Sequence, residues 1–402
     1  MKLRKSVKKA MEILHIDKLR RNQLKPINAI LDEKDTMVIA PTSFGKSIIY
    51  LLPALAQEDG ITVVIEPLIA LMHNQVQKLN KLNIPAAYLD STQSKSERKA
   101  VVNDLNNKRL KILYLAPERL ESDILSLIEE NNQIRIIVVD ECHCVTTWGS
   151  TFRDSYLSIG KYIDSLKYRP VIVALSATAI PEDRPRIMEL LSMRNVKVCE
   201  MSLYRSNLCF MKKDISGAAN RWKTLHKVMK KYHRNTTIIF CNTIETTTRV
   251  ADYLKERYPH EVAVYHSRAK GQERDMLTGK KHIIVATSAL SMGVDVPDVD
   301  LVIHFNMPLS VADYYQMAGR AGREGQHARS ILFYSQSDYK RNHELLKDIE
   351  NKATRKRALK QLDLMKEFCE DDEHCMVNAL LNALGDPYEN NCRYCTNCQK
   401  GR

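Results

Sequence analysis

Short runs of apolar, mostly β-branched residues recur along this chain, separated by helical or polar stretches. The first half carries TMVIA (36–40), TVVIEP (62–67), KILYLAP (111–117), IIVVD (136–140) and VIVALSAT (171–178). These runs are apolar throughout instead of alternating, as is typical of strands that are covered on both faces of a parallel sheet. The first half is therefore predicted to be an open α/β domain.

A second series of such runs predicts a second α/β domain in tandem. It comprises TTIIFCN (236–242), VAVYH (262–266), HIIVAT (282–287), DLVIHF (300–305) and SILFYS (330–335). Beyond it the tail is charged, helical in period and ends in a cysteine cluster. At 402 residues the chain has room for three domains, which we place at 1–205, 206–337 and 338–402.

Charge and composition indicate which kind of partner the chain binds and in which compartment it works. The balance of 61 Lys and Arg against 48 Asp and Glu gives a formal charge of +13, which favours a polyanion such as nucleic acid, although a basic surface can be idle. The basic opening residues lack the apolar core of a signal peptide and predict an amphipathic helix. No run approaches the roughly 18 apolar residues of a membrane span. We expect a soluble, intracellular protein without a membrane partner.

The segment APTSFGKS (40–47) fits a phosphate-binding loop between a strand and a helix. Gly45 lets the backbone approach phosphates, Lys46 supplies a positive charge, and Ser47 offers a hydroxyl to magnesium. The loop residues predicted to bind the nucleotide are Thr42, Ser43, Phe44, Gly45, Lys46 and Ser47.

Two adjacent carboxylates, Asp140 and Glu141, end the apolar run at 136–140. Magnesium needs oxygen ligands and an attacking water needs a base, so we assign Asp140 to the metal and Glu141 to the water. The alternative is an acidic pair that simply faces solvent at the end of a strand.

The segment QMAGRAGREG contains Gln316, Arg320 and Arg323, spaced so that one helical surface presents both guanidinium groups. Arginines brought from a second domain can stabilise charge that develops on a γ-phosphate. Alone, the segment could be a solvated basic helix. With the loop and the carboxylates it predicts an ATPase assembled across a cleft.

These motifs together resemble superfamily 2 helicases of the RecQ family. LRRNQ is similar to the family's adenine-recognition motif through Arg20 and Gln23, and DECH (140–143) resembles its DEAH box. LSATA, with Ser176 and Thr178, resembles the motif that couples hydrolysis to DNA binding, and Asp295 falls in a motif near nucleotide and DNA. The resemblance implies two tandem RecA-like domains followed by a small helical zinc-binding module.

Two features favour RecQ over RNA-directed relatives. The first is CVTTWGSTFRDSY (144–156), which resembles the family's aromatic-rich loop for single-stranded DNA. Trp148 and Phe152 could stack on bases and Arg153 could pair with phosphate, unless the aromatics are core residues.

The second feature is the cysteine spacing. Cys375 precedes Cys392, Cys395 and Cys398 at a spacing that suits a closed zinc site, as in the RecQ zinc module. Free thiols and an iron–sulfur cluster are the alternatives. Neighbouring groups that could substitute as ligands are Cys369 and His374, and the cysteines expected to be buried apolar residues are Cys142, Cys144, Cys199, Cys209 and Cys241.

Some positions depart from the family pattern. Ser43 and Phe44 stand where the family usually has glycines, and Ile16 stands where an aromatic would stack on the base. The family's winged-helix and terminal helical domains have no counterpart before Arg402, so we expect either a minimal form or a fragment.

The resemblance implies an ATP-dependent DNA helicase or translocase that moves 3′ to 5′ with ATP, Mg²⁺ and Zn²⁺. Its expected partners are single-stranded and partially duplex DNA. One alternative is a DNA- or RNA-stimulated ATPase that moves without unwinding. Another is a catalytically silent nucleic-acid-binding scaffold, whose signature would be loss of Lys46, Glu141 or an arginine, and all of these are present.

Overall fold

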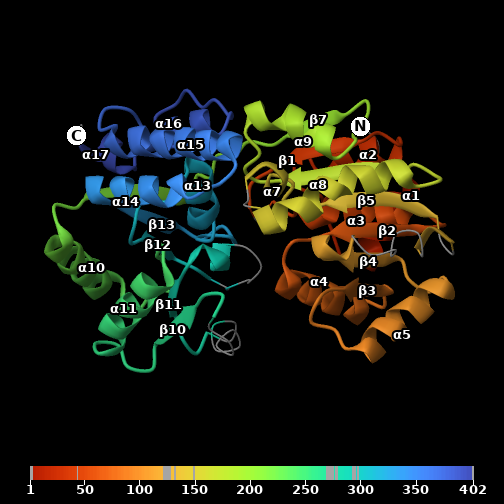
Figure 1. Cartoon of the computed structure of the whole chain (residues 1–402), viewed down its shortest axis with the longest axis horizontal. Coiled ribbons are helices and arrows are strands. Elements are labelled where there is room, and N and C mark those ends of the chain that lie inside the picture. The colour runs from red at the N-terminus through yellow and green to blue at the C-terminus, as the bar shows by residue number, and fades with distance from the viewer. Residues whose placement is uncertain are drawn as a thin grey trace. The chain divides into compact units, whose positions relative to one another are not determined.

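The computed structural model describes residues 3–42, 44–120, 128–130, 133–147, 150–268, 276, 279–291, 296 and 298–400. The chain divides into two compact units, Met1–Ser202 and Leu203–Arg402, called the first and second unit below. Each unit is built around one parallel sheet (Figure 1). The three domain ranges expected from the sequence stay predictions.

The first unit contains a seven-stranded sheet in the order β3-β4-β2-β5-β6-β1-β7, and its neighbouring strands are parallel. Its strands are β1 (Thr36–Ile39), β2 (Ile61–Ile65), β3 (Ala86–Leu89), β4 (Ile112–Leu115), β5 (Ile134–Val139), β6 (Val171–Ser176) and β7 (Lys197–Glu200). Its helices are α1 (Lys5–Ile13), α2 (Leu24–Leu31), α3 (Lys46–Ala56), α4 (Ile69–Lys81), α5 (Lys95–Asn106), α7 (Cys144–Thr147), α8 (Ser150–Ser165) and α9 (Arg184–Leu190).

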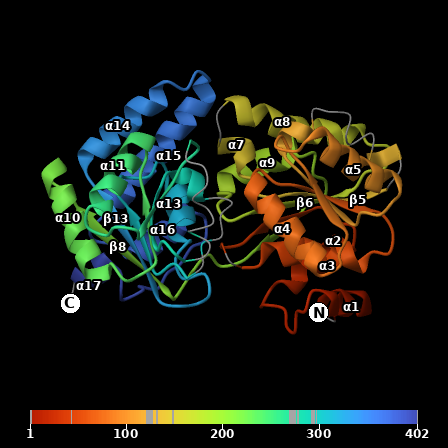
Figure 2. The same cartoon turned by 90° about the horizontal axis from the view of Figure 1, so that it is seen from below.

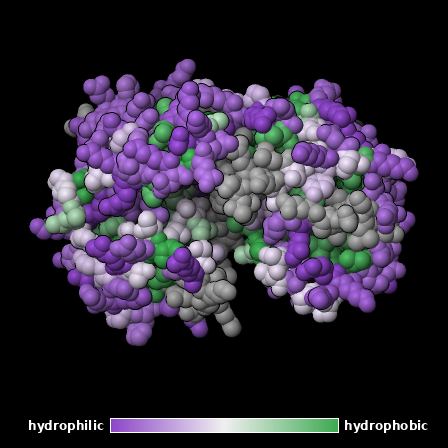
Figure 3. Space-filling view, viewed as in Figure 1, coloured by the Kyte–Doolittle hydropathy of each residue, from purple (hydrophilic) through white to green (hydrophobic). Residues whose placement is uncertain are grey.

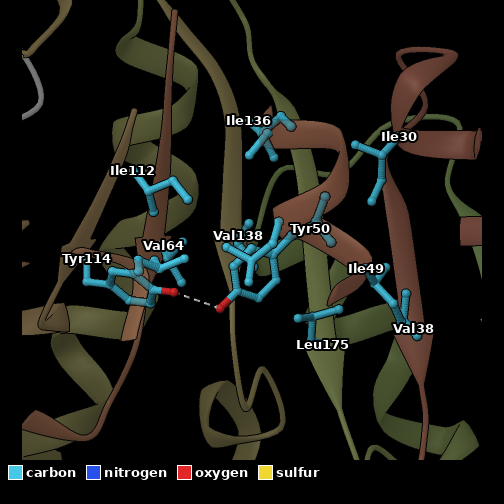
Figure 4. Packing of buried hydrophobic residues seen from close by; sticks show 14 of the residues in the cluster. Ile30, Val38, Ile49, Tyr50, Val64, Ile112, Tyr114, Ile136, Val138 and Leu175 are labelled. Carbon is cyan, nitrogen blue, oxygen red and sulfur yellow. Dashed lines mark hydrogen bonds between the residues drawn. The ribbon is translucent and has the colours of Figure 1, made fainter. Parts of the chain in front are cut away.

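Helices cover both faces of this sheet, with α2, α3 and α4 on one side and α8 and α9 on the other (Figure 2). Alternate strand residues, such as Val38 and Val138, belong to one core cluster with Ile49 of α3. Within that cluster the hydroxyls of Tyr50 and Tyr114 lie 3.0 Å apart (Figure 4), so the buried phenols satisfy one another. This bond links α3 to β4 directly behind the phosphate-binding segment.

The second unit contains a six-stranded parallel sheet in the order β10-β11-β9-β12-β13-β8. Its strands are β8 (Leu208–Asp214), β9 (Thr237–Phe240), β10 (Val262–Tyr265), β11 (Ile283–Ala286), β12 (Leu301–His304) and β13 (Ala328–Tyr334). Its helices are α10 (Ala218–Tyr232), α11 (Ile244–Lys255), α13 (Val311–Ala318), α14 (Gln336–Lys347), α15 (Lys352–Glu370), α16 (Met376–Ala383) and α17 (Thr396–Lys400). Apolar residues of α10 and α11 pack on one face of this sheet.

The sequence-based expectations for the fold are confirmed in outline. Each apolar run quoted above contains a strand, the sheets are parallel, the opening residues form α1, and the tail is helical. Three strands were missed, namely β3, β7 and β8. The prediction that residues 144–156 form a loop was wrong in part, because residues 144–147 form α7 and residues 150–165 form α8. Within the described residues, no helix is both long and apolar enough to span a membrane.

Candidate nucleotide and metal sites

The phosphate-binding segment ends on Gly45, which directly precedes α3 in the first unit. Gly45 has φ +83°, and a Cβ there would lie 3.0 Å from Gln23 Nε2, so only glycine fits without strain. Among the described residues, no side chain caps α3, so its first N–H groups can accommodate an anion. These features fit a phosphate group at the start of α3.

The segment around Arg20 and Gln23 is tied to this loop. The Arg20 backbone N–H donates to Gln23 Oε1 at 2.8 Å, and Gln23 Nε2 donates to the carbonyls of Phe44 (3.0 Å) and Gly45 (3.4 Å). Gln23 is buried. Sequence motifs about twenty residues apart are thus brought together. Thr42 lies in the same loop, Ser47 lies in the first turn of α3, and Phe44 packs against the core cluster.

The Lys46 ammonium group faces the acidic end of β5. Lys46 Nζ lies 3.8 Å from Glu141 Oε1, and it is buried without a hydrogen bond to any described residue. A buried, unbonded ammonium is costly unless an anion compensates it, which fits a phosphate ligand. Asp140 lies beside it, and its carboxylate accepts the Glu141 N–H at 2.8 Å.

Burial raises the pKa of Asp140 to about 6, with Lys46 lowering it and Glu141 raising it further. A carboxylate that is costly to ionise in isolation is well suited to a cation, because the cation removes that cost. Asp140 and the hydroxyl of Ser47 are therefore the groups here that could hold Mg²⁺.

His143 connects the acidic segment to the next strand, and the sequence reasoning gave it no role. Its Nδ1 lies 3.3 Å from Glu141 Oε2 and 3.0 Å from Ser176 Oγ, and Ser176 Oγ also accepts the Thr178 N–H at 3.0 Å. Burial opposes the imidazolium, but Cys144 and Glu141 raise the pKa of His143 above its ordinary value. Ser176 and Thr178 are thus linked to Glu141 through one imidazole.

Glu66 is a second residue of this site that the sequence motifs did not indicate. It follows β2, the strand paired with β5, and it is 2% exposed. Burial, together with the charges of Asp140 and Glu141, raises the pKa of Glu66 well above its ordinary value. The signal was present in the sequence, since Glu66 ends a predicted strand as Asp140 does.

In the second unit, the arginine segment differs from the expected helical surface. Helix α13 carries Gln316, but it ends at Ala318, so Arg320 and Arg323 lie in the following turns. Gly319 is the C-cap residue of α13, and Gly322, in the turns beyond it, has φ +64°. Arg320 is 5% exposed, and its guanidinium group donates to the Ser291 carbonyl, at 3.0 Å from Nε.

Two residues outside the predicted set hold these turns in place. Arg205 donates from Nη1 to the Gly319 carbonyl at 2.9 Å and from Nη2 to the Gly322 carbonyl. Asn207 Nδ2 donates to the carbonyls of Gly322 and Gln326, both at 2.8 Å. Burial, with the charge of Arg323 nearby, lowers the pKa of Arg205. We call this set of bonds the turn clamp.

Several predicted site residues fall outside the described part of the chain. Ser43, Trp148 and Asp295 are among them. Phe152 and Arg153 belong to the backbone of α8, but their side chains lie outside the described residues. The roles expected of these five stay predictions.

The four cysteines predicted as zinc ligands converge at the start of α16 and beside α17. All four Sγ atoms lie within 4.8 Å of one another, and the pairs Cys392–Cys398 and Cys375–Cys395 are each 4.0 Å apart. Sulfurs around a tetrahedral zinc with Zn–S of about 2.3 Å would be about 3.8 Å apart. The cluster therefore fits zinc closely.

The pKa shifts differ among the thiols of this cluster. The bond from Cys392, helped by the backbone N–H of Cys398 and opposed by burial, lowers the pKa of Cys395 to about 4. The bond to Cys395 and burial raise the pKa of Cys392, and burial and the bond to Cys395 raise that of Cys398, so the hydrogen bonds favour one thiolate, at Cys395. Neither alternative ligand joins the group, because the Cys369 side chain is buried elsewhere and His374 Nδ1 lies 3.0 Å from Asp371.

Lys212 on β8 fastens this segment to the second sheet. Its Nζ donates to the Cys369 carbonyl at 2.5 Å and to the Asp371 carbonyl at 3.2 Å, and it lies 2.8 Å from Asp372 Oδ1. Lys212 is 4% exposed, so these three oxygens compensate a buried charge.

Three family models match the chain in succession. They are described as DEAD/DEAH box helicase (residues 20–186), helicase conserved C-terminal domain (220–325) and RecQ zinc-binding (336–399). Among solved structures, Mss116p bound to single-stranded RNA and AMP-PNP matches with a TM-score of 0.70, at 18% identity, over 96% of this chain and 88% of that one. The fold and motifs together define the class of helicases with two RecA-like units.

Curated relatives identify the family within this class. The ATP-dependent DNA helicase RecQ of Synechocystis is 34% identical over 83% of this chain and 72% of its own length. RecQ of Bacillus subtilis is 34% identical over 96% of this chain and 65% of its own length. The chain belongs to the RecQ family. Apart from the Synechocystis protein, the curated relatives compared with this chain are longer, and the chain spans less than two thirds of the length of each.

Proposed function

We propose that this chain is an ATP-dependent DNA helicase or translocase that moves 3′ to 5′ on single-stranded DNA. The observation that carries the proposal is the continuous set of contacts in the first unit from Lys46 through Glu141 and His143 to Ser176. It joins a phosphate-binding charge, a candidate base and a coupling segment. Membership of the RecQ family, whose named relatives are DNA helicases, supports DNA over RNA.

In this proposal ATP binds against the start of α3. Arg20 and Gln23 hold the adenine, while the loop residues Thr42 to Ser47, with Gly45 at the helix start, hold the phosphates. Lys46 Nζ pairs with the phosphate oxygens, which releases Glu141 from its contact 3.8 Å away. Glu141 then accepts a proton from the attacking water.

A magnesium ion held by Asp140 and Ser47 would supply charge compensation for the phosphates. The Glu141 N–H donates a hydrogen bond to Asp140 Oδ1 at 2.8 Å, which orients the Asp140 carboxylate for this task. His143 orients the Glu141 carboxylate through its contact with Oε2. Because the same imidazole contacts Ser176, a movement of Glu141 would be felt at Ser176. Thr178 follows on the same segment.

Gln316, Arg320 and Arg323 are proposed to act from the second unit on charge that develops on the γ-phosphate. Asp295 is proposed to lie near nucleotide and DNA in the same unit. Because Arg320 is bonded to Ser291, its engagement would require exchange of that bond for a phosphate oxygen. The turn clamp then positions the arginines without touching the substrate.

Trp148, Phe152 and Arg153 are proposed to contact single-stranded DNA, and partially duplex DNA is the proposed substrate for unwinding. Zinc is proposed to be held by Cys375, Cys392, Cys395 and Cys398 in a structural role, because all four ligand positions come from protein sulfur. An open position for catalysis is absent from such a set.

The central test is ATP turnover with and without single-stranded DNA. Lys46→Ala should abolish hydrolysis, and Glu141→Gln should bind ATP but turn over at least about a hundredfold more slowly, because a positioned base is lost. Normal turnover in either variant would contradict the assigned roles. An exposed change on the same unit, Lys99→Gln, serves as the control.

Two further measurements separate the alternatives. RNA that stimulates turnover as well as DNA would favour an RNA-directed ATPase, and stimulation without strand separation would favour a translocase that does not unwind. A duplex with a 3′ tail should be unwound and one with a 5′ tail should not. A chain that binds DNA but never hydrolyses ATP would be a scaffold.

A further inference from the structure

The second unit begins with five residues, 203–207, that directly follow the first unit and precede β8. We call these residues the opening segment. The segment forms neither helix nor strand, so contacts with other parts of the unit must hold it in place. Those contacts reach two places. One is the set of turns after α13 that contains Arg320, and the other is the stretch from Cys375 to Cys398, called the cysteine segment below.

Tyr204 is held by the cysteine segment through both its ring and its hydroxyl. The ring stacks on that of Tyr388, with 4.4 Å between the ring centroids and 15° between the planes. The hydroxyl lies 3.3 Å from the hydroxyl of Tyr394, which stands between Cys392 and Cys395 in the sequence. Because stacked aromatic pairs keep a preferred geometry, the position of Tyr204 depends on how the chain folds around the four sulfurs.

The backbone of Leu203 is fixed by the same cysteine segment. Its N–H donates to Asp386 Oδ2 at 2.6 Å, and its carbonyl accepts from the Tyr315 hydroxyl of α13 at 2.7 Å. Tyr315 is buried, so this bond also satisfies a phenol that water does not reach. Leu203 is thereby joined to the cysteine segment and to the helix that precedes the arginine turns.

The cysteine segment is itself packed onto the rest of the second unit. The surface over α15 and α16 is mostly hydrophilic (Figure 3), whereas Leu380 and Leu381 of α16 are buried, and α16 contacts α13 and α15. On the next strand, Cys209 Sγ donates to the Tyr394 carbonyl at 3.2 Å. The cysteine segment is therefore anchored well enough to hold the opening segment in one position.

The other end of the opening segment supplies the turn clamp. Arg205 follows Tyr204 directly, and Asn207 is the second member of the clamp. The clamp donates to backbone carbonyls on both sides of Arg320 and Arg323. Adjacent Cα atoms are about 3.8 Å apart, so a shift of Tyr204 also moves the Arg205 backbone. Contacts thus run without a gap from the cysteine segment to the arginine turns, all within one unit.

We propose that Tyr204 is a positioning residue for ATP turnover, through which the cysteine segment sets the placement of Arg320 and Arg323. The role of the two arginines in turnover rests on the proposed function, whereas the coupling of Tyr204 to their turns does not. A group that stabilises a transition state must be held close to its productive geometry. Folding of the cysteine segment around zinc would then contribute to the chemical step, in addition to its local structural role.

The test measures ATP turnover without DNA, so that changes in DNA binding do not enter. Tyr204→Ala should lower kcat about tenfold at an unchanged KM for ATP, because misplaced groups lose transition-state contacts. Tyr388→Ala removes the other half of the stack and should lower kcat to a similar extent, whereas Tyr204→Phe keeps the stack and should retain most turnover. The matched control is Tyr258→Ala, which removes a half-buried tyrosine of the same unit whose ring stacks on His233 and should keep the wild-type kcat.

An equal loss of kcat in Tyr204→Ala and Tyr258→Ala, or a change in KM alone, would overturn the proposal. Hydrogen exchange tests the coupling independently of activity, with zinc content measured alongside. Tyr204→Ala should raise exchange in residues 319–326 while Tyr258→Ala should not, and unchanged exchange there would also overturn the proposal. Normal turnover of Arg320→Ala would contradict the proposed function instead, and the exchange result would still decide the coupling.

Discussion

His304 is an ionisable residue that the second unit keeps entirely away from water. It ends β12, is 0% exposed, and its ring lies 4.8 Å from Tyr314 and 5.8 Å from Phe240, measured between ring centroids. Neither ring nitrogen has a hydrogen-bond partner within the described chain. Burial lowers the pKa of His304 to about 3.

This burial predicts an acid-sensitive contribution to stability. The unfolded chain protonates His304 below about pH 6.5, while the folded chain does so only near pH 3, so stability is full above 6.5 and falls as pH decreases. Between about pH 6 and pH 5, the free energy of unfolding of the wild type should fall by about 1.4 kcal/mol per pH unit more than that of His304→Phe. Urea unfolding at several pH values measures the difference. His304→Leu is a second variant, and parallel profiles for all three proteins would refute the prediction.

At the scale of elements, the turn after α13 depends on Gly322. A Cβ there would lie 2.6 Å from Asn207 Nδ2 and 2.8 Å from the Gln326 carbonyl, in addition to the strain of φ +64°. Gly322→Ala should therefore destabilise the second unit by more than the roughly 1–2 kcal/mol that positive φ alone costs.

Gly279→Ala is the matched control, because Gly279 has φ +70° but no described atom within 4 Å of its added Cβ. Denaturant unfolding should rank Gly322→Ala well below Gly279→Ala in stability. Equal losses would mean that the turn clamp tolerates the extra methyl group.

The elements also show which parts of the fold the sequence could predict. Central strands were found because burial on both faces leaves a continuous apolar run. The three missed strands, β3, β7 and β8, all lie at sheet edges, where exposure breaks the run, as in the exposed Lys197 and Glu200 of β7.

The candidate site also contains features that the sequence could predict and features that it could not. The phosphate-binding loop and the four cysteines were predictable because each is a local pattern set by the chemistry of its ligand. The seven-residue spacing from Gln316 to Arg323 suggested one helical surface, but it could not predict the bond from Arg320 to Ser291. Arg205 was equally hidden, since it meets Gly322 from 117 residues away.

For the whole molecule, zinc should stabilise one unit and not the other. The cysteine cluster belongs to the second unit and is fastened to β8 through Lys212. We expect about one zinc per chain, and its removal by a chelator or by Cys395→Ser should raise hydrogen exchange in the second unit. Exchange in β1 to β6 should not change.

Metal analysis and hydrogen exchange with mass spectrometry measure both quantities. Lys212→Met offers a partner test, because it removes the anchor while leaving all four sulfurs. It should loosen α15 and α16 with zinc still bound. If the chain without metal showed unchanged hydrogen exchange, a structural role for the metal would be excluded.

The position of β8 has a consequence for how the chain is made. Among the described strands, β8 pairs with β13 alone, from Leu208 opposite Ala328 to Asp214 opposite Tyr334. During synthesis from the N-terminus, β8 therefore leaves the ribosome with no strand to join until β13 follows it. The second sheet closes late, and a ribosome that stalls before Tyr334 would release a chain with an unpaired, aggregation-prone edge.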